Sequence, residues 1–198
     1  MGYLEGLQDY LDKSYKLSVF DQALDSKTSW TFHLHNHRIV RAKVLENLTY
    51  DIRCEVDGEG EQTIQKVEVK CLYPSEGTDA IAPMIKTDKK VADLALEALF
   101  SPHKRFFIKN KTLFPLMKEK EVLFFTLLEG ERIKGLINAF SRYDITVNLK
   151  GGVPVTILRH AVYDLRNKKG RCFLKSRQET LRDWEKSPLF VSAPQSDK

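Results

Sequence analysis

Two short polar segments in the second half of the chain carry residue types that suit contact with a nucleic acid. The first contains Arg142 and Tyr143, and the second contains Arg159 and His160. An aromatic ring offers a face on which a base can stack, and nearby N–H donors reach phosphate or base oxygens. We therefore expect Tyr143 to stack a base beside two cationic groups, Arg159 and His160, while Arg142 adds positive charge.

The charge of the chain is divided unevenly between its halves. Residues 1–100 hold 12 Lys and Arg against 17 Asp and Glu, and residues 101–198 hold 20 against 10. A strongly basic half next to an acidic half indicates that the basic half binds a polyanion. A basic surface that only keeps the protein in solution is the alternative.

Other residues offer weaker chemistry. His33, His35 and His37 alternate along one predicted strand and are expected on its solvated outer face, without a metal. A metal-dependent enzyme built on these histidines is a third hypothesis. Catalytic signatures such as GxSxG, a P-loop or HExxH do not occur, so we expect no enzyme activity and no cofactor. Asp51 and Asp144 are expected to be hydrogen-bonding residues at strand ends.

Composition favours a cytoplasmic protein with no membrane segment. The longest apolar stretch, residues 122–128, has only the length of a strand. The N-terminal residues lack the basic start and apolar core of a signal peptide. Three cysteines without CxxC spacing indicate reduced, packed thiols.

An internal repeat appears at an offset of 93 residues. Apolar positions and the shared Tyr-Asp-Ile coincide when residues 39–44 are placed over 132–137, 50–52 over 143–145, and 64–69 over 157–162. No gap is needed. The repeat predicts two copies of one small module.

Within each copy the pattern predicts antiparallel strands that curl. Apolar residues alternate along 30–34, 145–149 and 153–157, which is typical of strands with one buried face. Gly135 and its counterpart Ala42 lie inside strand patterns and indicate a sharp bend. Helical spacing appears before each strand set, at residues 4–15 and 88–99. Residues 103–120 suit a short hairpin or a packed loop, and a further helix is expected near 178–186.

At this point the second copy resembles the bacterial Hfq (host factor) type of the Sm-like family. Residues 135–143 (GLINAFSRY) resemble the family's first signature, and residues 157–162 (ILRHAV) resemble its second. Leu7, Gln8 and Asp9 are similar to the family's opening helix. The resemblance implies an α+β, mainly β fold: two bent Sm-like barrels in tandem, each after a helix. The expected division is 1–75, a linker at 76–86, 87–167, and a basic extension at 168–198.

The same resemblance implies a function. In the family, the corresponding aromatic and Lys-His pair line uridine pockets between neighbouring folds. The expected RNA-contacting residues are therefore Tyr143, Arg142, Arg159, His160 and Phe140, with Tyr50 and Lys66 as weaker counterparts in the first copy. We expect an RNA chaperone that binds U-rich single strands, with three chains closing a ring of six folds. The alternative is a degenerate Sm-like scaffold for protein partners.

Overall fold

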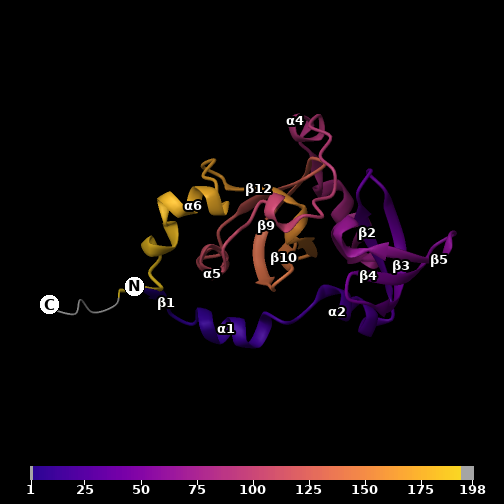
Figure 1. Cartoon of the computed structure of the whole chain (residues 1–198), viewed down its shortest axis with the longest axis horizontal. Coiled ribbons are helices and arrows are strands. Elements are labelled where there is room, and N and C mark those ends of the chain that lie inside the picture. Colours follow the sequence, from indigo (N-terminus) through magenta and orange to yellow (C-terminus); the bar gives the residue numbers. More distant parts are fainter. Residues whose placement is uncertain (1, 193–198) are drawn as a thin grey trace.

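Ten strands in two similar sets dominate the structure, a computed structural model that describes residues 2–192 (Figure 1). The first set comprises β2 (Ser29–Leu34), β3 (Ile39–Asn47), β4 (Asp51–Val56), β5 (Gly60–Gln65) and β6 (Val69–Pro74). The second comprises β8 (Leu123–Leu127), β9 (Glu131–Phe140), β10 (Asp144–Asn148), β11 (Pro154–Leu158) and β12 (Val162–Asn167). All pairings are antiparallel, and together with the helices they make an α+β fold.

The two sets follow the same plan. Their strand orders are β6-β2-β3-β4-β5 and β12-β8-β9-β10-β11, which place equivalent strands at equivalent positions. Even the short 3-10 turns η1 (Lys66–Glu68) and η5 (Arg159–Ala161) are separated by the predicted 93 residues. The helices that precede the strand sets, α2 (Val19–Ser26) and α5 (Asn110–Lys118), follow nearly the same offset.

One strand pairing joins the sets into a single sheet. β11 pairs with β6 through Thr156 opposite Leu72 and Ile157 opposite Cys71. The resulting path runs from β12 to β5 and does not close on itself within residues 2–192. The buried apolar residues form two clusters, one mainly within each set, and strands at the junction contribute to both: Cys71 and Tyr73 of β6 pack in the cluster of the second set, and Leu158 of β11 packs in that of the first.

The predicted bend coincides with a change of partner along a strand. Residues 132–135 of β9 pair with β8, whereas residues 136–140 pair with β10. Gly135 lies at this change, and a Cβ atom there would be 2.4 Å from the carbonyl oxygen of Asn148. Ala42, its fully buried counterpart in β3, likewise lies where pairing with β2 and with β4 overlaps.

The helices differ most from the predictions. α1 (Leu7–Ser14) was expected to precede the first strand set, but Leu4 and Leu7 belong to the core of the second. The Tyr10 hydroxyl donates to the Phe140 carbonyl oxygen (2.9 Å) and accepts from the Phe140 N–H (2.7 Å). The helix expected over 88–99 is only α4 (Lys89–Ala92), because Ala95 adopts φ +46° and turns the chain away.

Residues 103–120 contain a helix, α5, and the expected hairpin or loop is wrong. Leu113 and Phe114 are buried on this helix. The stretch expected to be a linker forms short helical turns, including α3 (Thr78–Ile81), followed by β7 (Lys86–Thr87), which pairs with β9. After β12 come α6 (Lys175–Leu181), η6 (Asp183–Lys186) and β13 (Phe190–Val191), which pairs with β1 (Tyr3–Leu4). The last residues of the predicted extension, 193–198, lie outside the described part.

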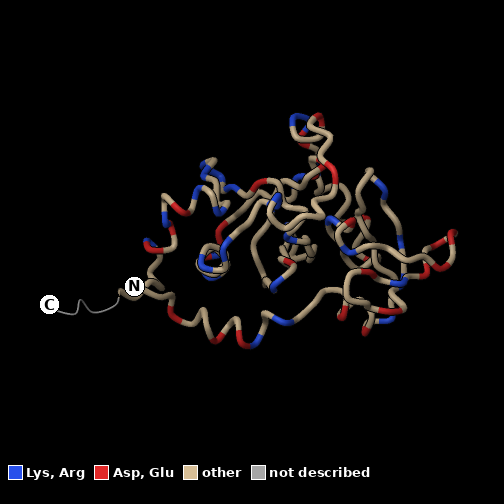
Figure 2. Tube along the Cα trace, viewed as in Figure 1, with Lys and Arg blue, Asp and Glu red and all other residues tan. Residues whose placement is uncertain are grey.

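The charge division of the sequence is visible along the sheet (Figure 2). Lys and Arg gather at α5 and in the loop between β12 and α6, while acidic residues mark the tip of the β4–β5 hairpin. None of the helices between residues 2 and 192 has the length and apolar character needed to cross a membrane.

A substitution at the partner change tests the bend. Gly135→Ala is expected to lower the free energy of unfolding by about 1–3 kcal/mol, because the added methyl group meets the Asn148 backbone in a packed sheet. Urea unfolding measures this change, and Lys134→Ala on the exposed side of the same strand is the control. Equal midpoints for the two variants would contradict the close approach.

Candidate functional site: a cationic groove beside the strand-set junction

The two polar segments singled out in the sequence meet in the structure. Tyr143 lies in the turn between β9 and β10, and Arg159 begins η5 directly after β11. Because β10 and β11 pair antiparallel, the two segments face each other, and the Arg159 N–H donates to the Tyr143 carbonyl oxygen (2.8 Å). The first set repeats this bond between the Lys66 N–H and the Tyr50 carbonyl oxygen (2.9 Å).

A groove of about 760 Å³ opens in front of these residues. Its walls come from α1, from residues 105–111, from the β9–β10 turn, from η5 and from the start of α6. The lining contains many cations and aromatic rings and no Asp or Glu: Leu7, Gln8, Leu11, Tyr15, Arg105, Phe106, Phe107, Ile108, Lys109, Asn110, Lys111, Arg142, Tyr143, Arg159, His160 and Lys175. Such a lining attracts a polyanion that also has flat apolar parts.

Arg159 lies at the back of this groove. Its Nη2 donates to Oδ1 of Asn110 (2.9 Å), and its guanidinium lies 5.5 Å from the centre of the Phe140 ring. Nε is buried without a hydrogen-bond partner, and no carboxylate among residues 2–192 forms an ion pair with this side chain. Burial lowers the pKa of Arg159 to about 10, so the group stays charged at neutral pH. The charge of the buried Asp144 raises the pKa of Arg159 against this effect, but Asp144 forms no ion pair with the guanidinium.

Tyr143 and Arg142 form the outer rim. The Tyr143 side chain is 59% exposed, and the Arg142 guanidinium lies 5.4 Å from the centre of its ring. The Arg142 N–H donates to the Tyr15 carbonyl oxygen (3.0 Å), which fixes the turn against the end of α1. The Tyr143 ring is therefore exposed to solvent, while hydrogen bonds from Arg142 to Tyr15 and from Arg159 to Tyr143 fix the backbone of its turn.

His160 is held at the junction between the strand sets. Its Nε2 donates to the carbonyl oxygen of Val69 at the start of β6 (2.9 Å). Burial lowers its pKa to about 4, and the nearby charge of Arg105 acts in the same direction. His160 is therefore neutral at pH 7, and the expectation of a second cation at this position is wrong.

Three other predicted residues lie elsewhere. Phe140 is 2% exposed and lies beneath Arg159 in the core, where it also contacts Tyr10 at 4.7 Å between ring centres. Tyr50 is 80% exposed but does not line the groove. The Lys66 ammonium donates to the backbone carbonyl oxygens of Leu48 and Thr49, so two of its N–H donors are already engaged within the protein.

The three strand histidines do not share a solvated face. His33 and His35 are buried, and Nε2 of His33 lies 3.0 Å from the Tyr73 hydroxyl. The reason is that β2 lies between β3 and β6 and that the helical turns after β6 cover its second face, as the contacts of Thr31 with Ser75 and Thr78 illustrate.

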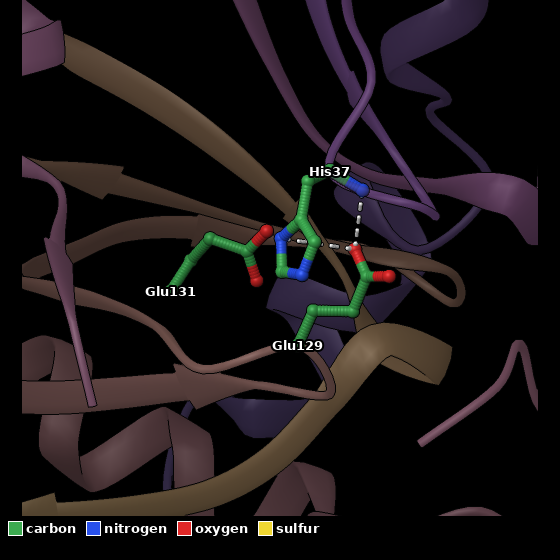
Figure 3. A group of neighbouring side chains, drawn as sticks. All are labelled: His37, Glu129 and Glu131. Carbon is green, nitrogen blue, oxygen red and sulfur yellow. Dashed lines mark hydrogen bonds and ion pairs between the residues drawn. The ribbon is translucent and has the colours of Figure 1, made fainter. Parts of the chain in front are cut away.

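His37 does approach two carboxylates, Glu129 and Glu131 (Figure 3). The N–H groups of Asn36 and His37 donate to Glu129 (2.7 and 3.1 Å). However, the fully buried Lys70 donates to both carboxylates and already supplies the cation of this cluster. The cluster is thus a buried ion pair across the two strand sets, and its donor set does not fit a metal ion without displacing Lys70.

The sequence reasoning missed one wall of the groove. Residues 104–111 (KRFFIKNK) alternate cations with aromatic rings, and Phe106 and Phe107 are 36% and 49% exposed. Basic residues interleaved with aromatic residues are themselves typical of a nucleic-acid surface, so this signal was available. No comparable pattern in the sequence indicated that α1 and Lys175 would line the groove.

Comparisons with known proteins assign no relative to this chain. No protein-family model, no curated protein and no solved structure matches it.

Two desolvated histidines, the buried His33 and the half-buried His160, predict a pH dependence of stability. Burial lowers the pKa of His33 and of His160 to about 4, whereas an unfolded chain has a histidine pKa near 6.5. The unfolded state therefore binds more protons below pH 6.5, and stability falls as the pH drops from about 6.5 to 4, by up to about 1.4 kcal/mol per pH unit for each group. Urea unfolding at several pH values measures the slope. His160→Gln should reduce it, and an unchanged slope would contradict the buried neutral state.

Proposed function

We propose that this chain is a tandem Sm-like protein that binds single-stranded RNA in the groove of its second strand set. The proposed activity is binding, without a reaction and without a cofactor. The Sm-like part of the proposal is supported by the repeated five-strand order, the bent strand at Gly135 and the motif resemblance of residues 135–143 and 157–162.

The observation that carries the RNA proposal is Arg159. Its guanidinium has a buried Nε without a hydrogen-bond partner and forms no ion pair among residues 2–192, although the charge of the buried Asp144 acts on it. Phosphate oxygens suit the planar fork of arginine and would supply an ion pair. The lining holds several cations and no acidic residue, and the nearest ion-paired carboxylate, Glu179, lies beside Lys109 and Lys175 at one end of the groove.

Single-strand binding also needs flat surfaces on which bases can stack, and exposed aromatic side chains provide them. Tyr143, Phe106 and Phe107 are all substantially exposed around the same groove. Every base has a face that stacks on such an exposed ring, and here three rings lie around one groove. A single strand with unpaired bases therefore fits this lining better than a duplex, whose bases are already stacked.

The first strand set is expected to contribute structure and little binding. The counterpart of Arg159 is Lys66, whose ammonium is occupied by two carbonyl oxygens, and the counterpart of His160 is Val67. Tyr50 thus projects without a free cation beside it. This difference provides a matched control within one chain.

RNA binding tests the proposal. Fluorescence anisotropy with a short U-rich RNA should show an affinity that falls with rising salt, because phosphate binding releases counterions. Tyr143→Ala is expected to weaken binding by about 1–3 kcal/mol, the value of one stacked base. Tyr50→Ala at the equivalent position of the first set should leave the affinity unchanged.

A second variant examines the proposed phosphate contact. Arg159→Lys retains the charge and loses the planar fork, so we expect weaker binding with the fold preserved by circular dichroism. Equal losses for Tyr143→Ala and Tyr50→Ala would overturn the groove assignment. Absence of RNA binding altogether would favour the alternative, a scaffold for protein partners.

A further inference from the structure

The two end strands of the long sheet, β5 and β12, are the counterparts of β11 and β6, the two strands that pair where the strand sets join. Inside the chain, Thr156 of β11 pairs with Leu72 of β6. At the offset of 93 residues, their counterparts are Thr63 in β5 and Leu165 in β12, which are the two end strands of the sheet. A second copy could therefore extend the sheet by placing its β5 against β12 in the register already used inside the chain.

Charge would favour that contact. With Thr63 opposite Leu165, the same antiparallel register brings the start of β5 to the end of β12, so the turn that holds Asp57 and Glu59 would lie near the turn that holds Lys168 and Lys169. The acidic tip of the β4–β5 hairpin would thus meet the basic loop that follows β12 (Figure 2). The register is the one already used inside the chain, and the opposite charges beyond the strand ends attract, so the occupant that best fits an open β12 edge is β5 of another copy.

The β12 edge is, however, already occupied by the same chain. The Phe173 N–H donates to the Leu165 carbonyl oxygen (2.9 Å), and the Asn167 N–H donates to the Arg171 carbonyl oxygen (3.1 Å). Cys172 forms a bridge with Arg166 between these two bonds. Leu165 is the counterpart of Leu72, which pairs across the junction of the two strand sets. The carbonyl oxygen that Leu165 directs away from β8 is therefore already bonded to Phe173.

This short edge segment, residues 171–173, is firmly anchored. Phe173 is 3% exposed and belongs to the core of the second strand set. The fully buried Gln178 donates to the carbonyl oxygen of Cys172 (3.2 Å) and to Asp183 (2.9 Å). Asp183 in turn pairs with Arg171 (2.6 Å). The C-terminal helices thus hold the edge segment in place.

We propose that residues 171–173 act as a built-in edge cap that substitutes for the β5 strand of a second copy. The cap ends the sheet after two strand sets, and the intact chain is a monomer. At the other end, β5 pairs only with β4 among the described residues and remains the open edge. The ring of three chains expected from the family resemblance then requires displacement of this cap. The inference depends on strand pairing alone and not on RNA binding.

Molecular mass in solution, measured by light scattering over a range of concentrations, tests the cap. The full chain and a chain ending at residue 191, which keeps the cap, are expected to be monomers. A chain ending at residue 169, which keeps β12 and loses the cap, is expected to self-associate, and high salt should weaken the association. A full chain that is trimeric, or a folded 1–169 chain that stays monomeric, would overturn the proposal.

A cross-link in the intact chain covers the case in which the truncated chain does not fold. The two bonds flanking Arg166 and Cys172 make them a non-hydrogen-bonded pair, in which side chains approach closely enough for a disulfide. Arg166→Cys should therefore form a nearly complete intramolecular disulfide with Cys172 under mild oxidation while the protein remains monomeric. Free thiols, or a disulfide between two chains, would show that the cap is absent in solution.

Discussion

The pairing of β6 on both of its sides is the constraint on which the rest of the structure depends. β6 closes the first strand set against β2 and at the same time receives β11 of the second. Contacts near this junction then become fixed: Lys70 of β6 is neutralised by two carboxylates of the second set, and His160 donates to Val69. Asp144 accepts from the Val19 N–H at the start of α2, which ties a helix of the first set to a strand of the second.

Two cations that are withdrawn from solvent, Lys70 and Arg159, differ in how their charge is compensated. Lys70 is fully buried and meets Glu129 and Glu131, so its charge is compensated inside the protein. Arg159 is partly buried with one neutral partner, Asn110, and its Nε has none among the described residues. The desolvation cost of Lys70 is offset by its own ion pairs, whereas Arg159 forms no ion pair among the described residues, and this is the difference on which the proposed anion site depends.

The two strand sets share a backbone plan and differ in what surrounds equivalent positions. The bond from Lys66 to Tyr50 repeats the bond from Arg159 to Tyr143, yet only the second pair lines a groove. The difference comes from residues 105–111 and from α1, which crosses from the N-terminus to pack on the second set. The same strand arrangement therefore occurs twice, and only the second copy has the additional segments that form the groove.

The sequence by itself determined the alternating strands and the repeat, because a period of two and a fixed offset are local properties of the chain. The grouping of Tyr143 with Arg159 came from the family resemblance, and the pairing of β10 with β11 brings the two residues together. The sequence also identified Asp144 as a strand-end hydrogen-bonding residue, as its bond with Ser141 shows. Only the tertiary structure decided which set α1 covers, since an amphipathic helix fits either core until Tyr10 meets Phe140, 130 residues away. The same holds for the buried His33 and the edge taken by Phe173, because burial and edge pairing depend on neighbours that lie far apart in the sequence.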